Sequence, residues 1–178
     1  MAILSSRRLY TGTRIHVDLD VVEFPGGTQG KLEMIRHPGA SAVIPFLDKP
    51  SDRDPRVILI RQFRHAADDY LWEIPAGTLD AGESPATCAA RELEEEAGVS
   101  ATRLEHLTTI YTTPGFTDEQ IHLYLATGLH RVPARREADE FMDTHEIRWS
   151  EVGRMIRAGA IRDGKSLSAL MYVQAFRR

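Results

Sequence analysis

Residues 77–99 read GTLDAGESPATCAARELEEEAGV, and the local signals in this stretch predict a helix with defined ends. Ser84 is a strong N-cap residue, and Pro85 suits the first helical position because an N–H there has no partner within the helix. Gly98 adopts the left-handed conformation of a C-cap without a steric penalty. The stretch therefore predicts a helix that begins after Ser84 and ends at Gly98.

The last turns of this helix carry a concentration of negative charge, from Glu92, Glu94, Glu95 and Glu96. The helix macrodipole makes a C-terminus negative, and like charges four residues apart, such as Glu92 and Glu96, repel each other. Both effects oppose folding unless a cation neutralises the carboxylates, and divalent cations bound through oxygen are suited to that role. The alternative is a solvated acidic helix face, which is common for charge runs.

The helix carries two separate stripes of side chains. One stripe is apolar, with intervals of four, three and four residues, and is predicted to pack on a sheet. It consists of Ala86, Ala90, Leu93 and Ala97. The second stripe brings Glu92, Glu95 and Glu96 together, where they can converge on Mg²⁺ or Mn²⁺. Arg91 precedes the first of these carboxylates and is placed to hold a carboxylate in a bidentate ion pair.

The whole stretch resembles the Nudix box, written G-x5-E-x7-R-E-U-x-E-E-x-G-U with U an aliphatic residue. All nine fixed positions match, and they are Gly77, Glu83, Arg91, Glu92, Leu93, Glu95, Glu96, Gly98 and Val99. The resemblance implies an α/β (α+β) Nudix fold, in which a mixed β-sheet is sandwiched between α-helices and an N-terminal β-hairpin forms an arm. It also implies that Glu92, Glu95, Glu96 and the backbone carbonyl of Ala76 hold the metal.

Composition sets limits on the class of protein. The length of 178 residues suits one domain over residues 1–178, with the hairpin arm at 1–38 and a catalytic core at 39–178. The net charge of −4 argues against a nucleic-acid partner. No apolar run is long enough to cross a membrane and no apolar leader is evident, so we expect a cytoplasmic enzyme. The single cysteine, Cys88, is expected to be a packed residue.

The pattern outside the box predicts strands before and after the box helix, and helices at the end. Apolar alternation, short apolar runs and Pro-Gly turns place strands within residues 10–24, 31–37, 41–47, 56–63, 71–75, 104–112, 120–126 and 146–149. Ser150 is predicted to cap a helix that ends at Gly159, and Ser166 to cap a last helix through Phe176. This order of elements predicts a mixed sheet covered by helices.

A pair of arginines, Arg61 and Arg64, lies at the end of a predicted strand just upstream of the box. Guanidinium groups bind phosphate oxygens in a bidentate manner, so the location favours a role in substrate binding. In Nudix hydrolases of this type the matching residues contact substrate phosphates. The alternative is a pair of surface arginines, and Glu73 either pairs with an arginine or is an ordinary strand residue.

Pro114 lies fifteen residues after Val99 and resembles the marker of the ADP-ribose pyrophosphatases within the superfamily. By this resemblance Gly115 lies near the terminal ribose, and Glu119 lies near the site. Glu33 matches a position that reads the adenine from a second subunit, which implies a homodimer with exchanged arms. The alternatives are an ordinary Pro-Gly turn and a hairpin that packs on its own domain.

Diphosphate hydrolysis needs an attacking water, charge neutralisation and a general base. Metal ions held by the box glutamates lower the pKa of the attacking water. By resemblance the base comes from an acidic loop after the box, but its spacing departs from the family pattern and leaves the choice open. The candidates are Glu140, Asp143 and the box residue Glu95.

Taken together, the resemblance implies a metal-dependent Nudix pyrophosphatase that hydrolyses ADP-ribose to AMP and ribose 5-phosphate. One alternative is the same chemistry on another nucleoside diphosphate sugar or dinucleotide, such as GDP-mannose, ADP-glucose, NADH or FAD. Another is a catalytically silent ADP-ribose sensor. The intact glutamates at 92, 95 and 96 disfavour the sensor, although a fold alone never fixes a function.

Overall fold

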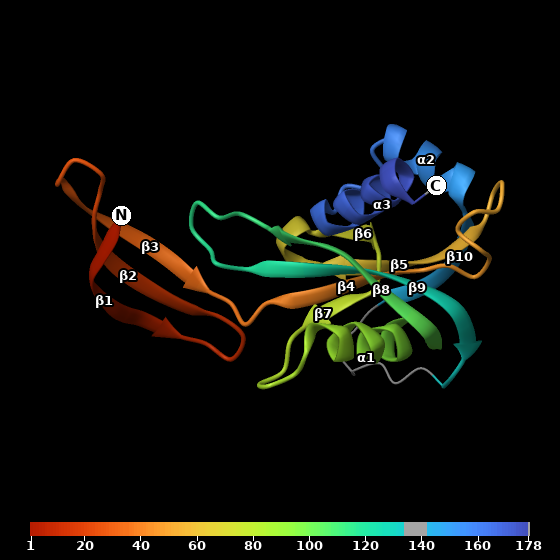
Figure 1. The fold of residues 1–178 in the computed structure, drawn as a ribbon, viewed down its shortest axis with the longest axis horizontal. Helices are drawn as coiled ribbons and strands as arrows, with labels where there is room; N and C mark the ends of the chain where they lie inside the picture. The colour runs from red at the N-terminus through yellow and green to blue at the C-terminus, as the bar shows by residue number, and fades with distance from the viewer. Residues whose placement is uncertain (134–141, 178) are drawn as a thin grey trace.

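The computed structural model describes residues 1–133 and 142–177 as an N-terminal arm beside a layered core (Figure 1). The arm is a three-stranded antiparallel sheet of β1 (Ala2–Thr11), β2 (His16–Glu23) and β3 (Gln29–Arg36). The core strands are β4 (Ala40–Pro45), β5 (Arg56–Arg64), β6 (Asp69–Glu73), β7 (Ala76–Thr78), β8 (Val99–Tyr111), β9 (Gln120–Arg131) and β10 (Met142–Arg148). The helices are α1 (Pro85–Ala97), α2 (Trp149–Arg157) and α3 (Gly164–Phe176), with a short 3₁₀ turn η1 (His65–Ala67).

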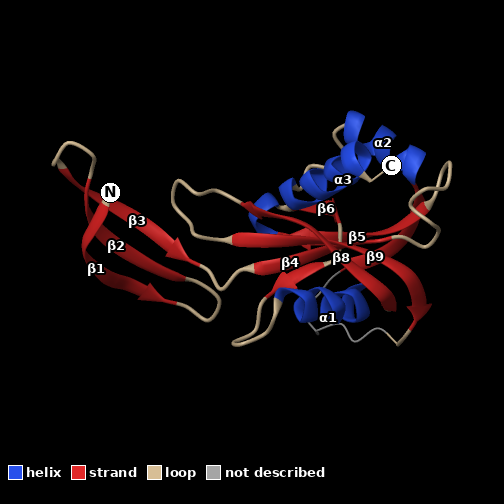
Figure 2. Cartoon of the chain, viewed as in Figure 1, coloured by secondary structure: helices blue, strands red, loops and turns tan. Residues whose placement is uncertain are grey.

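The core strands form two sheets between helices (Figure 2). One sheet has the order β7-β4-β9-β8, and it is mixed because β4 runs parallel to β9 while its other pairs are antiparallel. The second sheet has the order β10-β5-β6 and is antiparallel. Helix α1 covers one side of the sheets, and α2 and α3 cover the opposite side, as the sequence predicts.

The two sides of the sheets have separate apolar cores. On the α1 side, Leu93 and Ala97 pack with Val43 and Ile58. On the other side, Val152 of α2 and Leu170 of α3 belong to a larger cluster that includes residues of β4, β5 and β9. Both layers bury their apolar side chains almost completely, as β4 shows, since all six of its residues are buried. In the part of the chain that is described, no helix is both long and apolar enough to cross a bilayer.

The ends of α1 are those that the sequence predicts. Ser84 accepts a hydrogen bond from the Thr87 N–H at 3.1 Å, and Gly98 ends the helix in the left-handed conformation with φ of 63°. The predicted apolar stripe is partly wrong, because Ala86 is exposed and Ala89 is fully buried. Ala86 lies in the first turn, before the helix reaches the sheet, whereas Ala89 packs in the same cluster as Leu93.

The predicted caps of α2 and α3 are wrong, because both serines lie inside the helices. Ser150 donates its N–H to Asp54 Oδ1 at 2.8 Å, so the carboxylate at this helix start comes from the β4–β5 loop. Asp163 caps α3 by accepting the Ser166 N–H at 2.9 Å. The Ser166 hydroxyl instead accepts the Ile74 N–H at 2.9 Å, which ties α3 to the segment between β6 and β7.

The arm contains one strand more than the predicted hairpin. The hairpin itself is β2 paired with β3, and β1 adds to the other edge of β2. The arm is joined to the β8–β9 loop by backbone bonds, from the Ile35 N–H to the Phe116 carbonyl at 2.7 Å and from the Asp118 N–H to the Ile35 carbonyl at 3.2 Å. The Asp118 carboxylate also accepts the His37 N–H at 2.9 Å. The position of the arm therefore depends on this loop.

The burial pattern of α1 generates a stability prediction. Replacing Ala89 by Leu should lower the free energy of unfolding by about 1–3 kcal/mol, because three carbon atoms are forced into a filled core. The control Ala86→Leu, on the exposed side of the same helix, should change it by no more than about 0.5 kcal/mol. Urea unfolding of both variants measures the difference. Equal losses would contradict the burial of Ala89 and favour the stripe predicted from the sequence.

Candidate active site

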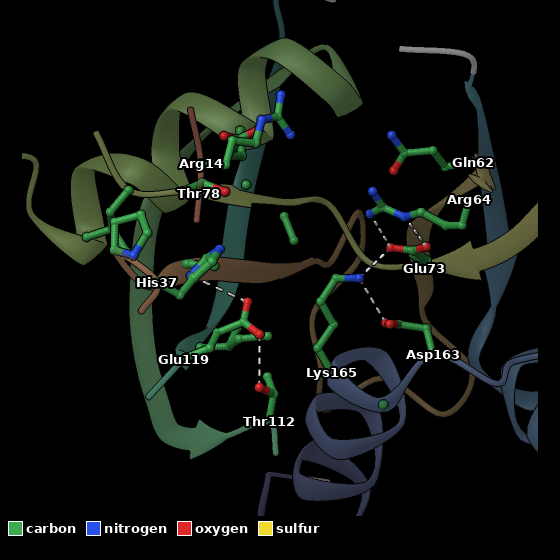
Figure 3. A pocket seen from close by; sticks show the side chains of 18 of the residues that line it. Arg14, His37, Gln62, Arg64, Glu73, Thr78, Thr112, Glu119, Asp163 and Lys165 are labelled. Carbon is green, nitrogen blue, oxygen red and sulfur yellow. Dashed lines mark hydrogen bonds and ion pairs between the residues drawn. The ribbon is translucent and has the colours of Figure 1, made fainter. Parts of the chain in front are cut away.

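A large pocket of about 1630 Å³ is lined by residues of the box, the core and the arm. We call it the central pocket. Its walls come from the box, the β5–β6 region, the start of α3, the β8–β9 loop and the turn between β1 and β2 (Figure 3). Thr13 and Arg14 of that turn line it, so the arm of the same chain reaches the site.

One wall of the central pocket is acidic. Glu92, Glu95 and Glu96 line it, and the residues Glu92 and Glu96 are only 6% and 2% exposed. Glu96 is held by the Ala76 N–H, which donates to Oε2 at 2.8 Å. A side chain at Gly77 would overlap the Glu92 carboxylate, so the glycine leaves the space that this carboxylate occupies.

Arg91 holds the acidic wall together. Its Nε and Nη2 donate to the two oxygens of Glu83, each at 3.0 Å, which is the bidentate pair that the sequence suggests. Its Nη1 donates to Glu92 at 2.6 Å and to Glu95 at 2.9 Å. The hydrogen bond from Arg91 lowers the pKa of Glu83 below its usual value, and the bond from Glu83 in turn raises the pKa of Arg91.

The donor chemistry of the acidic wall fits a hard divalent cation. Three carboxylates, those of Glu83, Glu92 and Glu95, pair with one guanidinium, and Glu96 lines the same pocket as Glu92 and Glu95. Oxygen donors of this kind are the ligands that Mg²⁺ and Mn²⁺ prefer. Within residues 1–133 and 142–177, no group of three or more His, Cys, Asp or Glu side chains is already arranged as a metal cage. The assignment of Ala76, Glu92, Glu95 and Glu96 as ligands thus stays a prediction.

The opposite wall carries two cations around one buried carboxylate. Glu73 is 1% exposed, and Arg64 donates to its two oxygens from Nε at 2.8 Å and from Nη2 at 2.7 Å. Lys165 of α3 forms an ion pair with Glu73 and also bonds Asp163 at 3.0 Å (Figure 3). Glu73 therefore pairs with an arginine, one of the two readings that the sequence left open. The sequence did not single out Lys165, because it lies 92 positions from Glu73.

The remaining predicted residues are spread over the molecule. Glu119 lines the central pocket, accepts the Thr112 hydroxyl at 2.9 Å and lies 3.6 Å from His37 Nδ1. Gly115 is exposed in the β8–β9 loop. Four described residues are not among those that line the pocket, and they are Gly115, Arg61, Asp143 and Glu33. Arg61 stacks over Tyr70 at 5.1 Å, Asp143 lies opposite Arg61 on β10, and Glu33 is exposed on β3. Glu140 lies outside the described residues.

Cys88 does not take part in the chemistry of the site as a nucleophile. It is fully buried on α1, and its thiol donates to the Gly77 carbonyl at 3.4 Å. Burial, helped by the charges of Glu83 and Glu92, raises the pKa of the thiol to about 11. Because the thiolate is the reactive form of cysteine, a thiol with this pKa is inert at neutral pH.

Comparison with known proteins places this site in a family. A model of the NUDIX domain matches residues 36–170, which is most of the chain. The chain belongs to the Nudix family. The resemblance carried by the box is thereby confirmed, and the matched Nudix region includes the core strands, α1 and α2.

Two Nudix relatives match over nearly the whole chain. An ADP-ribose pyrophosphatase of Bacillus subtilis is 35% identical over 173 residues, which cover 96% of this chain and 91% of that protein. An ADP-ribose pyrophosphatase of Mycobacterium tuberculosis is 37% identical over 177 residues, covering 97% and 82%. The crystal structure of an ADP compounds hydrolase has a TM-score of 0.84 and 21% identity, covering 98% of this chain and 92% of that chain. This last likeness confirms the predicted fold.

The Arg91 network generates a prediction about pH. The pKa of Glu83 is lowered in the folded protein, so its ion pair stabilises the fold above a pH of about 4.5, and this contribution is lost as the pH falls further. Arg91→Met should therefore be less stable than the wild type at pH 6, and the difference in unfolding free energy should shrink towards about pH 3. Urea unfolding across this range measures it.

Arg103→Met is a matched control, because Arg103 forms an exposed pair with Glu105 outside the box. Its loss should be small at every pH, since exposed ion pairs contribute about 0–1 kcal/mol. A difference between wild type and Arg91→Met that stays constant with pH would show that Arg91 acts by packing rather than by charge.

Proposed function

We propose that this protein is a metal-dependent Nudix hydrolase that cleaves the diphosphate of ADP-ribose, giving AMP and ribose 5-phosphate. The observation that carries the proposal is the central pocket, in which an acidic wall with Glu92 and Glu96 faces a cationic wall with Arg64 and Lys165. Carboxylates suit a divalent metal, and cations suit phosphate oxygens. The names of the two relatives support ADP-ribose as the substrate.

Some residues of the pocket are placed to bind the metal or the phosphates, and others hold those residues in position. When bound, Mg²⁺ or Mn²⁺ would neutralise phosphate charge and lower the pKa of the attacking water. Arg91 fixes the orientation of Glu92 and Glu95, and the Ala76 N–H fixes Glu96. Arg64 uses its Nε and Nη2 on Glu73, and among residues 1–133 and 142–177 no bond occupies its Nη1, which would donate to a phosphate oxygen.

The general base stays a prediction with three candidates. Glu95 lines the central pocket with about a third of its side chain exposed, so water can reach its carboxylate there. Asp143 is not among the described residues that line the pocket, and Glu140 lies outside the described residues. The geometry supports Glu95 over Asp143 as the group that takes the proton from water.

We propose in addition that the arm makes a homodimer. Six large apolar residues of the arm are exposed in the single chain, and they are Met1, Ile3, Leu4, Leu9, Tyr10 and Ile15. Apolar surface that gathers in this way is typical of an interface between proteins. A symmetric exchange of arms would cover it and would bring Glu33 to the partner's pocket. The expected setting is the cytoplasm, with no nucleic-acid or membrane partner.

The substrate is tested by product analysis. With Mg²⁺ or Mn²⁺, the protein should release AMP from ADP-ribose faster than it cleaves GDP-mannose, ADP-glucose, NADH or FAD, as measured by HPLC. Glu96→Gln should lower kcat for ADP-ribose by at least about 100-fold, because it removes charge from the acidic wall. Glu94→Gln is the matched control on the same helix, since Glu94 is exposed and lies outside the pocket.

The outcomes separate the alternatives. Faster cleavage of another diphosphate would keep the chemistry and replace the substrate. If no compound is cleaved but ADP-ribose raises the melting temperature, the sensor alternative holds. Equal activity of Glu96→Gln and Glu94→Gln would contradict the role of the acidic wall.

The exchanged arm is tested by mixing two inactive variants. Glu33→Ala damages only the arm, and Glu96→Gln damages only the box. If Glu33 serves the partner's pocket, refolding an equal mixture of the two should restore about a quarter of the wild-type activity, because one site in each mixed dimer is intact. If Glu33 serves its own chain, no activity should return. Co-purification of one untagged variant with the other carrying an affinity tag confirms that the dimers have mixed.

A further inference from the structure

The cationic wall of the central pocket places two cations, Arg64 and Lys165, beside the carboxylates of Glu73 and Asp163. Arg64 alone satisfies this carboxylate with two parallel bonds. Burial raises the pKa of Glu73, but the bonds from Arg64 and the charge of Lys165 outweigh it and hold the pKa below its usual value. Lys165 is thus a second cation beside Glu73, and it pairs with Asp163 as well.

Lys165 is placed where it can reach a ligand. Its side chain is 11% exposed, and the surface that remains open lines the central pocket (Figure 3). The ammonium group has three N–H donors, and two of them are used by Glu73 and Asp163. Glu73 lies behind the two cations with 1% exposure, so a molecule in the pocket meets Arg64 and Lys165 before it meets the carboxylate.

The start of α3 adds to this arrangement. Lys165 lies in the first turn of a helix of 13 residues, whose N-terminus carries the positive end of the macrodipole. Gly164 and Ser168 of the same helix also line the pocket. The Asp163 carboxylate already caps this helix end, so it is the two side-chain cations beside it that favour a further anion at the same wall.

The cationic and acidic walls are fixed to the same short segment. The Ile74 N–H donates to Ser166 of α3, and the Ala76 N–H donates to Glu96 of α1. These two N–H groups lie two positions apart along the chain, and the helices that they bond lie on opposite sides of the sheets. The distance between Lys165 and the box glutamates is thus set by the backbone and does not depend on a flexible loop.

We propose that Lys165 is a substrate-binding residue, which donates its third N–H to a phosphate oxygen of the diphosphate beside Arg64. This rests on the proposed function and assigns one of the groups that hold the substrate. The ion pair with Glu73 keeps the ammonium at the wall before the substrate arrives, which lowers the entropy lost on binding.

The test compares Lys165→Met with Arg162→Met in the full-length protein. Both variants remove one positive charge near the start of α3, but Arg162 forms an exposed pair with Asp69 and does not line the pocket. Lys165→Met should raise KM for ADP-ribose about tenfold or more, because a charge-assisted hydrogen bond is lost. Arg162→Met should change KM less than about twofold. Lys165→Arg, which keeps the charge, should lie nearer to the wild type than Lys165→Met.

Binding measured without turnover makes the test independent of the reaction. Calorimetric titration with ADP-ribose, and with inorganic pyrophosphate as a second probe, is expected to show weaker binding only for Lys165→Met. If Lys165→Met lowers the melting temperature but leaves KM and both affinities at the level of Arg162→Met, Lys165 is only a counter-ion of Glu73 and the proposal fails. If the wild type binds these probes but hydrolyses no diphosphate, the proposed function fails while the role of Lys165 in binding stands. If the wild type binds neither probe, both fail.

Discussion

The structure depends on burying carboxylates at the negative end of a helix. Glu92 and Glu96 are almost inaccessible, although the macrodipole of α1 and their mutual repulsion both oppose their charges. Three features make this arrangement stable: the guanidinium of Arg91, the Ala76 N–H and the space left by Gly77. Since β7 supplies two of the three, the strand and the helix form one unit, and the pocket is built around it.

The parts of the fold that the sequence predicts are those encoded by neighbouring residues. The ends of α1 follow from Ser84 and Gly98, and β4 and β5 follow from short apolar runs. The caps of α2 and α3 could not be chosen in this way. In isolation, Ser150 and Ser166 are as good cap residues as the aspartates that the two helix starts use. Strand β1 was missed because all ten of its residues are exposed, so it has no apolar alternation to detect.

The candidate site likewise has one part encoded by neighbouring residues and one part that depends on residues far apart in the sequence. Its acidic wall comes from one contiguous stretch, so the spacing of the glutamates along the helix predicts it. Its cationic wall joins β5, β6 and α3, and the pairing of Lys165 with Glu73 spans 92 positions, which no local pattern can specify. The arginines at 61 and 64 look equivalent in the sequence, yet of the two only Arg64 lines the pocket, where it pairs with Glu73, whereas Arg61 lies over the ring of Tyr70.

The space at Gly77 has a consequence for how this site can change over generations. The Glu92 carboxylate fills the volume that any side chain at position 77 would occupy, so the two positions are not free to vary independently. A descendant that loses the glutamate gains room for alanine at 77, whereas the reverse order of substitutions must first displace the Glu92 carboxylate from its bond with Arg91. Substitution at both positions 77 and 92 is therefore expected in a homologue that keeps this fold but has lost the acidic wall.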